Sequence, residues 1–123
     1  MITGIGTDMC MISRMKRAAA NDSFIRRVFS EEEISYAMSQ GEPARHFASA
    51  FAAKEALAKA SGLGMFGMGL TGAWVRRTKQ GPVMMMSDET KSKLRETGTD
   101  KCWLSITHEG DFAIAFVVLE AGI

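Results

Sequence analysis

The chain has 123 residues, 46% of them hydrophobic, which is enough for one hydrophobic core and too little for two ordinary domains. Its formal net charge of +1 argues against a general nucleic-acid-binding surface, and no apolar run is long enough to cross a membrane. The N-terminal segment MITGIGTDMC lacks the basic start and long apolar core of a signal peptide. We therefore expect a single domain over residues 1–123, located in the cytoplasm, with Cys10 and Cys102 as free thiols.

The first residues predict one strand followed by short helices. MITGIGTD reads as a strand, interrupted by Gly4 and Gly6, that brings Asp8 close to its end. Short helices are expected over MISRMKRAAA and SFIRRVF, with Asn21 or Asp22 as the cap between them.

Two further helices follow. Ser30 and Glu33 match a capping box, in which the hydroxyl accepts from the N3 amide and the glutamate reaches back. GEP at residues 41–43 ends that helix and starts the next, because glycine suits a C-terminal cap and proline a first turn. A long helix is expected from Ala44 to Ala60, ending at Ser61–Gly62.

The second half predicts two antiparallel hairpins and one more helix. LTGAWVRRTK and PVMMM flank a turn at Gln80–Gly81, and KCWLSITH and FAIAFVVLE are joined by EGD. Between the hairpins, SDETKSKLRETG predicts an amphipathic, capped helix with Gly98 beyond its end. The expected class is α+β, with helices gathered in the first half and antiparallel strands in the second.

Charged residues interrupt the long, alanine-rich helix. Glu55 and Lys59 lie one turn apart, which alone predicts an exposed ion pair worth about 0.2–0.5 kcal/mol. Eight alanines between positions 44 and 60 let other elements approach closely, however, so a charge there needs a partner or a function. Asp8 is the candidate partner of Glu55. Two facing carboxylates repel unless a cation or a shared proton lies between them, and Mg²⁺ suits such a pair, although spacing alone is a weak signal.

Two other segments have alternative interpretations. Gly62, Gly64 and Gly67 match GxGxxG, but they follow a helix instead of a strand, which excludes a dinucleotide-binding fingerprint. They form either a flexible loop or a backbone that approaches a ligand or a neighbouring subunit. The basic segment 13–29 is either a solvated helix surface or a surface for an acidic partner.

Together these residues resemble the holo-[acyl-carrier-protein] synthases, the small class of 4′-phosphopantetheinyl transferases. The resemblance covers nearly the whole chain and rests on GIGTDMCMISRM, FSEEEI, FAAKEALAKASG and WLSITHEGDFAIAFVVLE. It implies a 4′-phosphopantetheinyl transferase-like fold, in which an antiparallel sheet packs against the long helix and shorter helices. The implied reaction is Mg²⁺-dependent transfer of the 4′-phosphopantetheine arm from coenzyme A to a serine of apo-acyl carrier protein, releasing 3′,5′-ADP, in fatty acid biosynthesis.

The resemblance also implies roles for individual residues. Asp8 and Glu55 would hold the metal on the pyrophosphate, and with Lys59, which would neutralise the phosphates, they would form the catalytic centre. Glu55, or a water on the metal, would take the serine proton. Lys54, in the family's Lys-Glu-Ala motif, would bind the phosphates or lie on the helix surface. Further coenzyme A contacts are implied for Arg45, His108 and Gly62, although His108 also fits a hairpin residue without such a role.

The carrier surface and the assembly are implied in the same way. Arg14 matches the family arginine that faces the acidic carrier protein, and Arg17 and Arg26 are weaker candidates. A homotrimer with active sites shared between subunits is implied. Ala50 stands where many members carry an arginine, and Met11 where many carry an acidic residue. The alternatives are a catalytically inactive module that binds carrier proteins and a structural subunit with a fortuitous ion pair.

Overall fold

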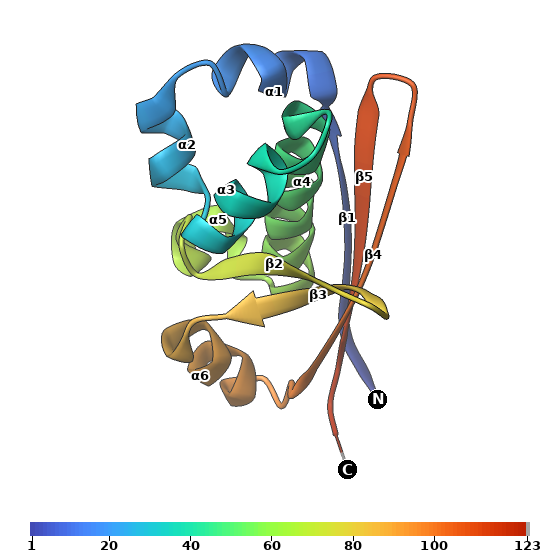
Figure 1. The fold of residues 1–123 in the computed structure, drawn as a ribbon. Helices are drawn as coiled ribbons and strands as arrows, with labels where there is room; N and C mark the ends of the chain where they lie inside the picture. Colours follow the sequence, from blue (N-terminus) through green and yellow to red (C-terminus); the bar gives the residue numbers. More distant parts are fainter. Residues whose placement is uncertain (123) are drawn as a thin grey trace.

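The computed structural model describes residues 1–122, which form a three-stranded antiparallel sheet with helices on one side of it (Figure 1). The sheet consists of β1 (Ile2–Met11), β4 (Lys101–Glu109) and β5 (Phe112–Glu120), in the order β1-β5-β4. The central strand is therefore the last one, and β1 pairs with it along its length. β2 (Ala73–Thr78) and β3 (Gly81–Met86) form a separate antiparallel hairpin.

The long helix α4 (Pro43–Ser61) occupies the centre of the molecule (Figure 1). It contacts β1 and β5 on one side and α1 and α3 on the other. Its neighbours among the shorter helices are α1 (Ile12–Ala18), α2 (Asp22–Val28) and α3 (Glu31–Met38). Most of its side chains are buried, because alanines let these elements pack close to the helix on nearly every side. Among residues 1–122, no helix is long and apolar enough to span a bilayer.

The helix ends follow local sequence signals. Asn21, the first of the two candidate caps, accepts from the Phe24 amide and begins α2. Ser30 and Glu33 form the expected capping box of α3. Gly62 ends α4 in the left-handed conformation, at a φ of 75°. The predicted α+β class and the order of elements are confirmed.

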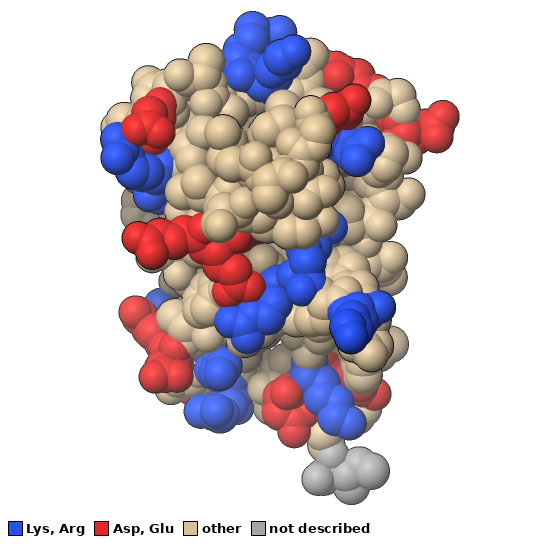
Figure 2. All heavy atoms as spheres, viewed as in Figure 1, with Lys and Arg blue, Asp and Glu red and all other residues tan. Residues whose placement is uncertain are grey.

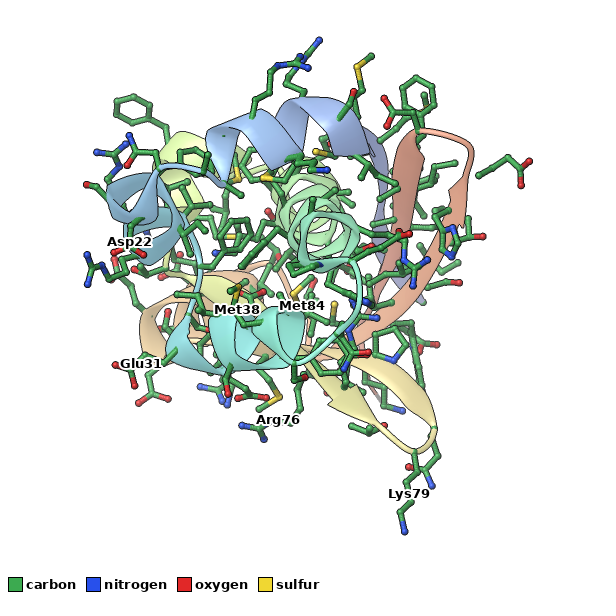
Figure 3. The ribbon with its side chains drawn as sticks, turned by 45° about the horizontal axis from the view of Figure 1, so that its top comes forward. Asp22, Glu31, Met38, Arg76, Lys79 and Met84 are labelled. Atoms are coloured by element: carbon green, nitrogen blue, oxygen red, sulfur yellow. The ribbon has the colours of Figure 1, made fainter. Side chains whose placement is uncertain are left out.

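Two segments differ from expectation in detail. The glycine-rich segment after α4 contains a short helix, α5 (Gly64–Met68), where a loop was expected. In the β2–β3 hairpin, Thr78 pairs with Gly81, so the turn residues are Lys79 and Gln80, one position earlier than expected. Figure 3 shows Lys79 at the hairpin tip, projecting away from the other elements. The last helix, α6 (Asp88–Glu96), begins after its cap Ser87.

The two faces of the sheet differ in their surroundings. The inner face of β5 is fully buried against α4 through Ala113, Ala115, Val117 and Leu119. The outer face carries large apolar side chains that are about half exposed or more: Ile5 (63%), Met9 (57%), Trp103 (57%) and Phe116 (45%). These four residues come from all three strands, and we call them the outer apolar face. Such a contiguous apolar surface is typical of an interaction site.

Candidate active site

Two glycines bring β1 against the backbone of α4. A Cβ atom at Gly4 would collide with the carbonyl oxygen of Ala60, and one at Gly6 would collide with that of Ala56. The Gly6 position would also place a Cβ only 2.8 Å from the amide nitrogen of Ala60. Neither glycine has a positive φ, so it is the available space, and not the backbone conformation, that requires glycine here.

Asp8 follows these glycines on the same face of β1, because side chains alternate along a strand. Its carboxylate accepts a hydrogen bond of 2.9 Å from Lys59, whose ammonium also donates to the backbone oxygen of Thr7 over 3.1 Å. The spacing alone would pair Lys59 with Glu55, one turn away on the same helix. The structure instead joins it to Asp8, across the contact between strand and helix.

Glu55 lies one turn before Lys59 on α4, where its charge interacts with those of Asp8 and Lys59. Burial raises the pKa of Glu55, the negative charge of Asp8 raises it further, and the positive charge of Lys59 acts in the opposite direction. Burial and the charges of Asp8 and Glu55 likewise raise the pKa of the Cys10 thiol, while Arg14 lowers it. The structure therefore brings Asp8, Glu55 and Lys59 together, and their roles in metal binding and catalysis stay a prediction.

These groups lie on the least buried stripe of α4. Phe51, Glu55 and Lys59 are spaced by four residues and are the only partly or fully exposed side chains of the described helix between Ala48 and Ala60. The polar side chains of this stripe are therefore accessible to a ligand, while the other side chains of residues 48–60 are buried.

The carboxylates of Asp8 and Glu55 fit a magnesium ion. Both supply hard oxygen donors, and a cation would relieve the repulsion that raises the pKa of Glu55. Within residues 1–122, no group of three or more His, Cys, Asp or Glu side chains could hold a metal. Two carboxylates suit Mg²⁺, which usually completes its octahedron with waters and substrate phosphates.

Lys54 requires a correction. It was expected to contact coenzyme A phosphates or to lie on the helix surface, but its side chain is 1% exposed. The ammonium donates to the backbone oxygens of Val28 and Leu70 and lies 3.8 Å from a Glu33 carboxylate oxygen. Burial lowers the pKa of Lys54, and Glu33 opposes this change. With its donors directed into the core, Lys54 is not available to a phosphate at the surface.

Arg45 lies away from Asp8, and His108 belongs to a second group of basic residues. Arg45 precedes Glu55 by ten residues of α4, a rise of about 15 Å, so within one chain it is remote from the Asp8 site. Burial lowers the pKa of His46, and the nearby charges of Arg77, Arg45 and His108 lower it further. These four residues form a second group, which we call the basic cluster. Sequence reasoning missed His46 and Arg77, because nothing in the local pattern brings them together.

The residues predicted to bind the carrier protein lie on α1 and α2. Arg14 and Arg17 are exposed on α1, and Arg26 is exposed on α2 with an ion pair to Asp22. Figure 2 shows basic side chains over α1 at the top and beside α2 at the left, with acidic groups close to the latter. Because Arg14 lowers the pKa of Cys10, which Asp8 and Glu55 raise, its charge lies beside the site.

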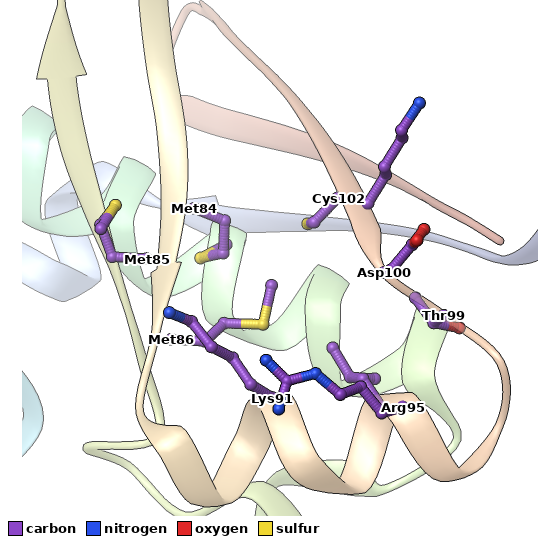
Figure 4. Close-up of a pocket in the computed structure, with 10 residues that line it drawn as sticks. Met84, Met85, Met86, Lys91, Arg95, Thr99, Asp100 and Cys102 are labelled. Atoms are coloured by element: carbon purple, nitrogen blue, oxygen red, sulfur yellow. The ribbon is translucent and has the colours of Figure 1, made fainter. Parts of the chain in front are cut away.

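Two cavities lie away from the Asp8 site. One, of 420 Å³, is formed by β3, α6 and the start of β4, with Met86, Lys91 and Arg95 in its wall (Figure 4). The other, of 610 Å³, lies among α1, α2, α3 and the start of α4, and Arg45 lines it. Neither is lined by Asp8, Glu55 or Lys59, so both are separate from the group at the contact between β1 and α4.

The family follows from comparison with known proteins. The model of the 4′-phosphopantetheinyl transferase superfamily matches residues 4–117, and the chain belongs to this family. The holo-[acyl-carrier-protein] synthase of Clostridium beijerinckii is 41% identical, over 98% of this chain and 99% of the relative. That of Syntrophotalea carbinolica is 37% identical, over 97% and 96%.

A solved structure has the same fold. The crystal structure of the holo-[acyl-carrier-protein] synthase from Neisseria meningitidis matches with a TM-score of 0.90 and 34% identity, covering 98% of this chain and 99% of that one. The expectation of a 4′-phosphopantetheinyl transferase-like fold is confirmed.

Proposed function

We propose that the protein is a holo-[acyl-carrier-protein] synthase, which transfers 4′-phosphopantetheine from coenzyme A to a serine of apo-acyl carrier protein and releases 3′,5′-ADP. The observation that carries this proposal is the meeting of Asp8, Glu55 and Lys59 where β1 touches α4, in a chain of this family. The named relatives and a Bacillus anthracis synthase solved with coenzyme A (3′,5′-ADP), at 32% identity and a TM-score of 0.81, support the choice of substrates.

The reaction is a phosphoryl transfer. The serine oxygen forms a bond to the phosphorus that carries pantetheine, the bond from that phosphorus to the bridging oxygen breaks, and the electron pair leaves with 3′,5′-ADP. Such a transfer needs positioning and charge neutralisation more than a protein nucleophile. Asp8 and Glu55 would hold Mg²⁺, which when bound supplies positive charge to the pyrophosphate. Lys59, held by Asp8, adds a second positive charge on the same side.

Glu55 is the candidate for the general base. Burial and Asp8 raise its pKa in the metal-free protein, and a cation held by the same carboxylate would lower it again. The serine proton would go to Glu55 or to a water beside it.

The carrier would dock beside this site. Arg14 and Arg17 present positive charge on α1, next to the end of β1 that carries Asp8. An acidic carrier protein complements this charge, and Arg26 on α2 would extend the same surface. The proposal places the reaction in the cytoplasm and in fatty acid biosynthesis.

A homotrimer completes the proposal. The outer apolar face exposes four large apolar side chains to solvent, and a second and a third copy of the chain are its proposed partners. The basic cluster contains Arg45, which lies about 15 Å along α4 from Glu55 of its own chain. In a trimer it would approach a neighbour's site, so that Arg45 and His108 could bind the phosphates of coenzyme A there. Gly62, which ends α4, would bring its backbone close to the same ligand.

Intact-mass measurement of apo-acyl carrier protein tests this function. The carrier is incubated with the protein, coenzyme A and Mg²⁺, with and without chelator, beside a Glu55→Ala variant. A gain of one phosphopantetheine that needs both the metal and Glu55 is expected. Binding of several carriers without any mass gain would contradict the proposal and indicate an inactive carrier-binding module.

Ala50 is 4% exposed, so the small residue there fits the packing and does not by itself mark a lost site.

A further inference from the structure

Lys54 is a buried cation next to Glu55 on α4. Its ammonium donates to two backbone oxygens outside the helix, those of Val28 and, over 2.6 Å, Leu70. A buried ammonium without such partners would destabilise the fold, so these contacts allow a lysine to remain in the core. An apolar side chain of the same length would avoid that risk. The use of lysine here therefore indicates that its directional contacts matter.

Glu33 is the counter-ion of Lys54 and has partners on both carboxylate oxygens. Its side chain is 2% exposed, and one oxygen lies 3.8 Å from the Lys54 nitrogen and accepts from the Ser30 amide at 3.0 Å. The other oxygen accepts from the Val75 amide at 2.8 Å. The pair thus joins the end of α2, the start of α3, α4, the segment after α5 and β2.

Two sets of contacts fix α4 from different sides. The glycines of β1 touch the helix backbone at Ala56 and Ala60, which sets the separation of strand and helix and restricts turning of the helix on that side. Lys54 restricts turning from the other side, because its hydrogen bonds to segments outside the helix would break. Glu55 is the next residue, about 100° further around the helix. The rotation that Lys54 fixes is therefore the one that directs Glu55 toward Asp8.

We propose that Lys54 and Glu33 are positioning residues for the transfer reaction, which set the rotation of α4 and thereby the direction of Glu55. Because the Leu70 oxygen belongs to the segment after α5, the same contact holds the glycine-rich segment 62–72 against the helix. The inference rests on the proposed function only for its kinetic test, since its structural test needs no substrate.

Hydrogen exchange of the resting protein is the structural test. Lys54→Met keeps the side-chain length and removes the charge and the donors. We expect amides of α4 near Glu55 and of segment 62–72 to exchange about tenfold faster, while those of β5 are unchanged. Leu94→Ala, which creates a core defect beneath α6 at a residue 4% exposed, is the matched control. It should lower the melting temperature without this selective change.

Steady-state kinetics with coenzyme A, Mg²⁺ and apo-acyl carrier protein is the second test. Lys54→Met should lower kcat by about tenfold to a hundredfold and raise the Mg²⁺ concentration needed for half-maximal rate. The KM for the carrier should stay the same, because α1 is not touched. Glu33→Gln should shift these quantities in the same direction by less, and it replaces Lys54→Met if that variant does not fold.

The outcomes separate the two hypotheses. If both variants lose only melting temperature, as Leu94→Ala does, the pair is a stability feature and the inference is overturned. If the unmodified protein transfers nothing, the proposed function fails, and the exchange comparison still decides whether Lys54 fixes α4.

Discussion

Glu55 lies where burial and the charge of Asp8 both oppose its ionisation, with Lys59 acting in the opposite direction. The same surroundings have two consequences. A carboxylate with a raised pKa accepts a proton more readily, and its ionised form makes the folded state less stable. The raised pKa that would make Glu55 a better proton acceptor therefore also makes the folded state less stable when Glu55 is ionised, a conflict that is common at sites selected for activity.

Replacing Glu55 by glutamine should reveal this conflict in thermal unfolding. The folded-state pKa of Glu55 lies above its unfolded value, so its stabilising contribution is present at low pH and is lost as pH rises through the raised pKa. Glu55→Gln should therefore melt at a higher temperature than the unmodified protein at neutral pH, and the difference should shrink toward acid pH. A difference independent of pH would show that ionisation of Glu55 is not its cause.

Arg14 should govern recognition of the carrier and leave coenzyme A binding unchanged. Arg14→Glu reverses a charge on α1 beside the site, so it should raise the KM for an acidic carrier by about tenfold. Titration of each substrate in turn measures the two KM values. Lys91→Glu, the same change on α6, is the control and should alter neither value. An equal rise in both KM values for Arg14→Glu would argue against a carrier surface.

At the scale of elements, the site depends on one strand and one helix meeting without side chains between them. Gly4 and Gly6 allow this contact, and Asp8 is the next inward residue of the strand. A larger separation would move Asp8 away from Glu55 and Lys59 at once. The distance between the elements is therefore a property of the site.

Gly6→Ala should change that distance. Its Cβ would meet backbone atoms of α4, which cannot move aside as a flexible side chain can, so we expect a loss of about 1–3 kcal/mol of stability. Activity in the surviving folded protein should fall by about tenfold or more, because small displacements of catalytic groups are costly. Gly41→Ala is the control, since nothing lies within 4 Å of its added Cβ. Denaturant unfolding and the mass assay measure both effects.

Local signals predicted much of this architecture. The capping box of Ser30 and Glu33 and the hairpin between β4 and β5 depend on residues close in sequence, and both are confirmed. The burial of Lys54 could not be predicted, because α4 is enclosed on nearly all sides and its apolar pattern does not show which charged residue faces inward. The bond from Glu33 to the Val75 amide links residues 42 positions apart, beyond any local pattern.

At the scale of the whole molecule, the outer apolar face is the largest feature that the described chain does not explain by itself. Its residues alternate along each strand with inward residues that form the core, so the sheet is apolar on both sides. A second layer is expected on such a sheet. The proposed trimer supplies it, and it also brings each basic cluster toward a neighbour.

Ile5→Glu should break that assembly. The residue is 63% exposed at the centre of a strand, so the charge is harmless in a single chain and costly when buried between copies. Sedimentation equilibrium should show a trimer for the unmodified protein and a monomer for the variant. Activity should fall by about a hundredfold although Asp8, Glu55 and Lys59 are retained. Met38→Glu, a similarly exposed position on α3, should remain trimeric and active. A monomeric unmodified protein would refute the proposed assembly.

The pairing of β1 with β5 determines when the Asp8 site can form during synthesis of the chain. Asp8 lies opposite Ala115 in the sheet, so the strand that carries the carboxylate acquires its neighbour only after the intervening residues 12–111 have been synthesised. Such distant pairing slows folding, because a long loop must close before any contact stabilises it. A nascent chain would hold the sequence of α4, with Glu55 and Lys59, before it could hold Asp8 in place. The Asp8 site of one chain should therefore form abruptly, when β5 leaves the ribosome, instead of growing with chain length.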